Sequence, residues 1–148
     1  MVNNGTAEKI IECKTLQELP AAATEIIKEA GSHTIWLFQG AMGAGKTTLI
    51  REICAAFRVE DNVSSPTFSL VNEYQNEDGD VFYHFDFYRI KDETEAMDIG
   101  CEEYFYSGDI CFIEWPSQVT NLIPERNLTI QIVENSDHSR SIALYKNG

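Results

Sequence analysis

Gly40-Ala41-Met42-Gly43-Ala44-Gly45-Lys46-Thr47 matches G-x-x-x-x-G-K-[ST], the pattern of a phosphate-binding loop or P-loop, at every fixed position. The apolar run from Thr34 to Phe38 precedes it with the composition of a β-strand, and the segment from Thr48 to Phe57 follows it with helical spacing. A P-loop needs this context, because its backbone N–H groups and the N-terminus of the following helix together attract a phosphate. The stretch therefore predicts a nucleotide site within an α/β fold.

Two side chains of this loop act directly on a bound nucleotide. Lys46 is expected to reach the β- and γ-phosphates, and the hydroxyl of Thr47 is expected to bind Mg²⁺. The glycines allow the backbone to turn its N–H groups toward the anion. The nucleotide-binding residues predicted from this motif are Gly40, Gly43, Ala44, Gly45, Lys46, Thr47 and Thr48.

The remaining patterns complete a single P-loop NTPase domain over residues 1–148. We expect a central, mostly parallel sheet flanked by helices, with a β-hairpin inserted after the P-loop helix and an antiparallel hairpin at the C-terminal end. Thr15 and Glu18 have the spacing of a helix capping box, but Pro20 indicates a later start or a bent first turn. The predicted strands cover residues 10–12, 34–38, 68–74, 81–87, 110–113, 128–132 and 140–145, and the predicted helices cover 16–30, 48–57 and 92–98.

The charge of the chain narrows the class of function. There are 24 acidic and 11 basic residues, which give a formal net charge of −13. Contacts to nucleic-acid phosphates need clustered Lys and Arg, so a broad RNA-binding surface is not expected and any tight RNA contact would come from a partner. We find no apolar run of membrane-spanning length and no signal peptide, so we predict a cytoplasmic protein without membrane contact.

Two carboxylates follow apolar strands and are candidates for the catalytic and metal site. Asp86 follows the run 81–85, and Glu114 follows the run 110–113. Ligands of open α/β sheets bind beyond the carboxyl ends of the parallel strands, so both acids are well placed for Mg²⁺ or for the hydrolytic water. A strand that simply ends in a charged residue would have the same pattern.

Three further features allow two interpretations each. The hydroxyls of Ser64-Ser65-Pro66-Thr67 would cover the γ-phosphate as a switch loop does, or the segment is an ordinary turn. His84 shares a strand face with Asp86, and a structural role is favoured over a catalytic one. Trp115 would either wall the nucleotide site or pack in the core.

Together these residues resemble the TsaE (YjeE) family, small P-loop ATPases required for threonylcarbamoyladenosine formation in tRNA. The resemblance covers about residues 34–116 and rests on four blocks in the family's order and spacing. These are Gly43-Ala44-Gly45-Lys46-Thr47-Thr48, Ser65-Pro66-Thr67-Phe68, His84-Phe85-Asp86-Phe87-Tyr88-Arg89 and Glu114-Trp115-Pro116.

The resemblance implies a set of roles for these residues. ATP and Mg²⁺ would bind at the P-loop, with Lys46 on the phosphates and Thr47 and Asp86 serving the metal. Glu114 would support hydrolysis by positioning water or metal. Thr67 would belong to a switch-like loop, and Trp115 would lie near the nucleotide. The family acts with TsaB and TsaD, so the implied partners are the TsaB–TsaD complex, with tRNA contacted only indirectly.

Other classes of P-loop protein remain as alternatives. A small-molecule kinase usually carries an Arg-rich lid, and the 11 basic residues of this chain are scattered. A regulatory GTPase would carry N-K-x-D and D-x-x-G motifs, and neither occurs in the sequence. A nucleotide-gated adaptor with little turnover stays open, because weak hydrolysis and ATP-dependent docking use the same residues.

Overall fold

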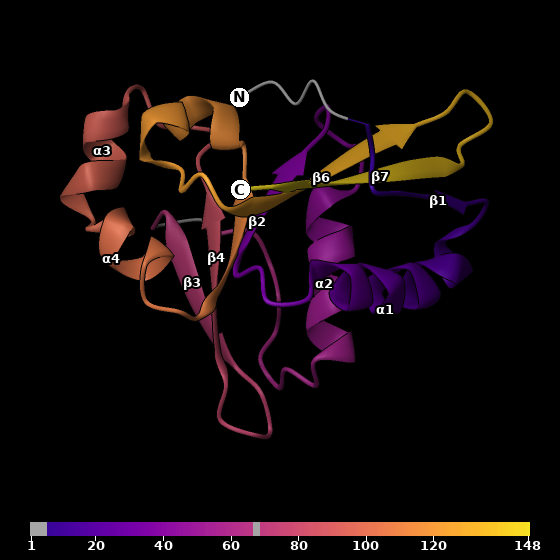
Figure 1. The fold of residues 1–148 in the computed structure, drawn as a ribbon, viewed down its shortest axis with the longest axis horizontal. Coiled ribbons are helices and arrows are strands. Elements are labelled where there is room, and N and C mark those ends of the chain that lie inside the picture. Colours follow the sequence, from indigo (N-terminus) through magenta and orange to yellow (C-terminus); the bar gives the residue numbers. More distant parts are fainter. Residues whose placement is uncertain (1–5, 67–68) are drawn as a thin grey trace.

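The computed structural model describes residues 6–66 and 69–148 and contains a seven-stranded sheet in the order β1-β7-β6-β2-β5-β4-β3 (Figure 1). The strands are β1 (Lys9–Cys13), β2 (Ile35–Gln39), β3 (Val71–Gln75), β4 (Val81–Asp86), β5 (Ile110–Glu114), β6 (Asn127–Glu134) and β7 (Arg140–Asn147). The α-helices are α1 (Leu19–Ala30), α2 (Lys46–Ala56), α3 (Glu93–Asp98) and α4 (Cys101–Phe105), and the 3₁₀ helices are η1 (Leu16–Glu18) and η2 (Pro116–Leu122). None of the helices in these described ranges is long and apolar enough to cross a membrane.

The sheet is mixed, with parallel strands in the centre and antiparallel strands at both edges. β2 pairs in parallel with β5 and β6, and β4 pairs in parallel with β5. The β3–β4 and β6–β7 hairpins are antiparallel, as predicted, and β1 adds another antiparallel pairing along β7. The prediction of a mostly parallel sheet is therefore correct for the four central strands, β6, β2, β5 and β4, and wrong for the sheet as a whole.

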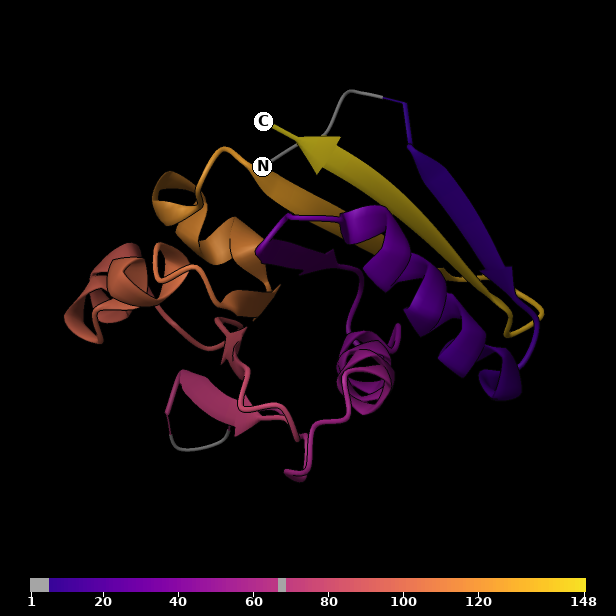
Figure 2. The ribbon, with the colours of Figure 1, turned by 60° about the horizontal axis from the view of Figure 1, so that its bottom comes forward.

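Helices cover both faces of the sheet, and the two cores divide the apolar residues of β2, β4 and β5 between them. Trp36 and Phe38 of β2 pack in the core beneath α1 and α2, whereas Ile35 and Leu37 pack in the core beneath α3, α4 and η2. Figure 2 shows α1 and α2 together on one side, with α3, α4 and η2 grouped apart from them. This alternation follows from the period of two in a β-strand, and it buries β2 from both sides.

The structure shifts two predicted boundaries. The α-helix begins at Leu19, with Pro20 in its first turn, so the later start indicated by the proline is confirmed. Thr15 makes no side-chain cap, and Glu18 instead accepts a hydrogen bond from the backbone N–H of Lys14. The strand predicted over 68–74 corresponds to β3 (Val71–Gln75), and residue 68 lies outside the described residues.

Candidate nucleotide-binding site

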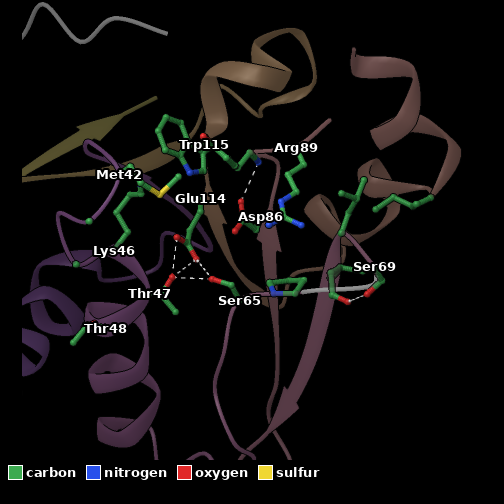
Figure 3. A pocket seen from close by; sticks show the side chains of 17 residues that line it. Met42, Lys46, Thr47, Thr48, Ser65, Ser69, Asp86, Arg89, Glu114 and Trp115 are labelled. Carbon is green, nitrogen blue, oxygen red and sulfur yellow. Dashed lines mark hydrogen bonds between the residues drawn. The ribbon is translucent and has the colours of Figure 1, made fainter. Parts of the chain in front are cut away.

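A cavity of about 830 Å³ opens where β2, β4 and β5 end and α2 begins (Figure 3). Its walls come from the P-loop, the loop before β3, the end of β4 and the end of β5. The carboxyl ends of these parallel strands meet at one edge of the sheet, so side chains that are far apart in sequence converge there. Of the predicted site residues, the cavity is lined by Gly43, Gly45, Lys46, Thr47, Thr48, Asp86, Glu114 and Trp115.

The P-loop backbone is held in a shape that only small residues allow. Gly45, the residue before α2, has a φ of 102°, which a residue with a Cβ rarely adopts. A Cβ on Gly40 would lie 2.8 Å from the carbonyl oxygen of Ile132, so β6 limits the space at the start of the loop. Gly40 and Ala44 thus shape the loop without lining the cavity. The resulting loop leads directly into the N-terminus of an 11-residue helix, an arrangement that suits a bound phosphate.

Lys46 is buried and lies against Trp115. Its Nζ is 3.7 Å from the centre of the indole ring, and it donates a hydrogen bond to the carbonyl of Gly40. Burial lowers the pKa of Lys46, while the nearby charges of Glu114 and Asp86 raise it. A cation held in this partly desolvated position favours an anion beside it, as a nucleotide phosphate would be.

Thr47, Ser65 and Glu114 bring their side-chain oxygens together beside this lysine (Figure 3). The Thr47 hydroxyl is 3.0 Å from each carboxylate oxygen of Glu114 and 2.9 Å from the Ser65 hydroxyl. The hydroxyl hydrogens of Thr47 and Ser65 are the only ones shared among these four oxygens, so several lone pairs remain for a further ligand. Hard oxygen ligands of this kind suit Mg²⁺.

Asp86 completes the acidic part of the cavity. It is paired with Glu114 in the register of β4 and β5, and its Oδ1 accepts a hydrogen bond of 3.0 Å from the backbone N–H of Tyr88. Burial is the main cause that raises the pKa of Asp86, and the charge of Glu114 raises it further. A divalent cation would stabilise both carboxylates, so Thr47, Asp86 and Glu114 fit the predicted Mg²⁺ site. Mg²⁺ normally completes its shell with water and phosphate oxygens rather than with a cage of acidic side chains.

His84 positions the Glu114 carboxylate from behind. It is fully buried, and its Nε2 lies 2.7 Å from Oε2 of Glu114. Its Nδ1 lies 2.9 Å from the hydroxyl of Tyr74 on β3. The burial of His84 agrees with the favoured interpretation of a structural histidine. The residue that it holds in place is Glu114, the candidate catalytic acid.

Sequence reasoning missed two residues at this site. The sequence pattern indicates Tyr74 only as part of a strand, although the register of β3 and β4 places it on the same sheet face as His84. Arg140 begins β7, and its Nε donates a 3.0 Å hydrogen bond to the carbonyl of Ala44 in the P-loop. No local motif indicates that contact, because it joins residues 96 positions apart. The predicted switch residue Thr67 lies outside the described residues.

Comparisons with known proteins give the same family for most of the chain. The family model described as "Threonylcarbamoyl adenosine biosynthesis protein TsaE" matches residues 13–142. The chain is 41% identical over 105 residues to the tRNA threonylcarbamoyladenosine biosynthesis protein TsaE of Haemophilus influenzae, an alignment that spans 71% of this chain and 65% of that protein. The protein of the same name from Bacillus subtilis is 34% identical over 132 residues, which span 88% of this chain and 77% of the relative.

A solved structure shares the fold. The crystal structure of YdiB from Bacillus subtilis superposes with a TM-score of 0.73, over 98% of this chain and 90% of that chain. The two sequences are 24% identical in this superposition. The likeness supports the α/β architecture with its mixed sheet.

Proposed function

The chain belongs to the TsaE family, whose members act in tRNA threonylcarbamoyladenosine biosynthesis, and from this we propose that it is a Mg²⁺-dependent ATPase serving that modification. The main support for this proposal is that Lys46, Thr47 and Glu114 lie together at the N-terminus of α2. A cation, a hydroxyl and a carboxylate in that arrangement are the parts that a P-loop ATPase uses.

The residues of the cavity would divide the work between binding and hydrolysis. The P-loop N–H groups and Lys46 would hold the β- and γ-phosphates, with Trp115 limiting the movement of the lysine side chain. Thr47 and Asp86 would hold Mg²⁺, which neutralises charge on the phosphates when it is bound. Glu114 would orient the attacking water or hold the metal, and His84 would keep its carboxylate aimed at the cavity.

A role with protein partners agrees with the strongly acidic charge of the chain. We propose that ATP turnover is weak in isolation and rises when the TsaB–TsaD complex binds. The net charge of −13 gives this chain little means to hold tRNA itself, so contact with tRNA would be indirect. The proposed site of action is the cytoplasm, where both ATP and tRNA are present.

Phosphate release by the wild type and by Glu114→Gln tests the hydrolytic role. We expect kcat to fall by about 100-fold or more, as for loss of a general base, while calorimetry still detects ATP binding. Lys46→Ala should instead abolish nucleotide binding, because it removes charge-assisted hydrogen bonds to phosphate.

Glu103→Gln is the matched control, since Glu103 is an exposed carboxylate on α4 that lies outside the cavity. Unchanged turnover in Glu114→Gln would remove Glu114 from the mechanism. ATP binding without turnover under any condition would favour a nucleotide-gated adaptor.

A further inference from the structure

A buried chain of hydrogen bonds connects the loop before β3 with the candidate catalytic acid. It runs from the backbone of Ser64 through the Tyr74 hydroxyl and the His84 ring to Glu114. Tyr74, His84 and Glu114 are each less than 4% exposed, so water does not compete for these bonds. The three side chains come from β3, β4 and β5, and the register of the sheet brings them together.

The direction of the hydrogen bonds in this chain follows from the carboxylate of Glu114 at its end. A carboxylate accepts hydrogen bonds, so His84 Nε2 carries the hydrogen that lies 2.7 Å from Glu114 Oε2. In the neutral ring Nδ1 is then an acceptor, and it receives the hydroxyl hydrogen of Tyr74 at 2.9 Å. The Tyr74 oxygen in turn accepts the backbone N–H of Ser64 at 3.3 Å. With the His84 ring neutral, all three donors point toward Glu114.

Asn72 removes the need for Tyr74 to donate its hydrogen to the Ser64 carbonyl. The Tyr74 hydroxyl also lies 2.9 Å from the carbonyl oxygen of Ser64, which is a competing acceptor for its single hydrogen. Asn72 Nδ2 donates to that same carbonyl at 3.0 Å, so the carbonyl is satisfied while Tyr74 donates to His84. Hydrogen bonds aligned in one direction polarise and strengthen one another.

The loop reaches Glu114 by a shorter route as well. The Ser65 hydroxyl lies 2.9 Å from Thr47 Oγ1 and 3.4 Å from Glu114 Oε2. Ser64 and Ser65 are neighbours, so one short segment is linked to the same carboxylate through its backbone and through its side chain. A displacement of this segment would therefore disturb His84 and Ser65, two of the three side chains that contact Glu114, and leave Thr47 as the third.

We propose that Tyr74 and His84 are positioning residues that couple the placement of the loop Ser64–Pro66 to the orientation of the Glu114 carboxylate. This inference rests on the proposed ATPase function, because it assigns the two residues a role in how that same site is regulated. The contact of Ser64 with Tyr74 supports the His84 ring, which together with Thr47 holds Glu114 in its observed orientation. Anything that moves the loop would thus change hydrolysis through the setting of Glu114, with no change at Lys46.

Removal of the Tyr74 hydroxyl tests the kinetic part of the coupling. Tyr74→Phe keeps the buried ring, and we expect kcat to fall about tenfold while KM and ATP affinity change by less than about twofold, as for a residue that supports a catalytic group. Tyr145→Phe is the control, because its hydroxyl makes a 3.5 Å contact with Gln131 at an exposed position. An unchanged kcat, or an increase in KM at constant kcat, would overturn the proposal.

Hydrogen exchange at the Ser64 amide tests the coupling without turnover. We expect Glu114→Gln to raise the exchange rate of this amide several-fold in the wild-type background and to have no further effect in Tyr74→Phe. If the exchange rate of the Ser64 amide is the same in Glu114→Gln as in the wild type, the coupling is overturned even if ATP hydrolysis proceeds normally. Coupled exchange together with absent ATP hydrolysis would support the coupling and contradict the ATPase function.

Discussion

Asp86 and Glu114 place two carboxylates at paired positions of neighbouring parallel strands. Glu114 is buried and Asp86 is half-buried, and burial together with the charge of Glu114 raises the free energy of the charged form of Asp86. Such a pair is unfavourable for stability and favourable for binding a divalent cation. At the scale of single residues, the site therefore exchanges stability for function.

We predict that Asp86→Asn stabilises the nucleotide-free protein at neutral pH and weakens Mg²⁺-dependent ATP binding. The folded state raises the pKa of Asp86 above its ordinary value of 3.8, mainly by burial, so ionisation of this group costs stability as pH rises through the raised pKa. Thermal unfolding at about pH 7 should show a melting temperature higher by on the order of 1–3 °C.

The pH dependence distinguishes this cause from better packing. Below about pH 3.8 the wild-type carboxyl is protonated in both states, so the advantage of the Asn variant should disappear. Asp98→Asn, at an exposed position on α3, is the control. A gain that stays constant from about pH 7 to about pH 4 would show that charge at Asp86 is not the source.

At the scale of elements, the P-loop is fixed between β2, β6 and the start of β7. The carbonyl of Ile132 limits space above Gly40, and Arg140 holds the carbonyl of Ala44. Arg140 is itself paired with Glu134 at 3.1 Å across the β6–β7 hairpin. The C-terminal hairpin therefore supports the loop from outside the cavity.

We predict that Gly40→Ala lowers both stability and nucleotide affinity. The new methyl group would meet the Ile132 carbonyl at 2.8 Å and the Ala44 methyl at 3.3 Å, so the loop or β6 must shift. Overpacking of this kind costs about 1–3 kcal/mol in unfolding free energy. Denaturant unfolding and ATP calorimetry measure the two effects, with the exposed neighbour Ala41→Ser as control. Wild-type affinity in Gly40→Ala would contradict the tight junction.

At the scale of the whole molecule, local patterns predicted most elements and left their partners undetermined. The strand and helix around the P-loop, both hairpins and the helix capped by Asp92 are confirmed, because each has a signal within a few residues. The prediction of a mostly parallel sheet was wrong for the sheet as a whole, because alternation identifies a strand but not the strand that pairs with it. Lys46, Thr47, Asp86 and Glu114 could be selected for the same local reason.

Tyr74 and Arg140 could not be selected, because their importance depends on tertiary register. Tyr74 reaches His84 only when β3 pairs with β4 in one specific register. Arg140 reaches the P-loop only because β6 lies between β2 and β7. The order of the strands is a long-range property, and no pattern within a short window reports it.

For the whole molecule, we propose that this acidic protein couples ATP hydrolysis to another complex that carries the tRNA chemistry. Its most direct test is the rate of phosphate release from Mg·ATP, measured for the full chain alone and with added TsaB–TsaD complex. We predict a low rate alone, an increase of at least about tenfold with the complex, and loss of that increase in Glu114→Gln. A rate that TsaB–TsaD leaves unchanged, while ATP still binds, would contradict the account.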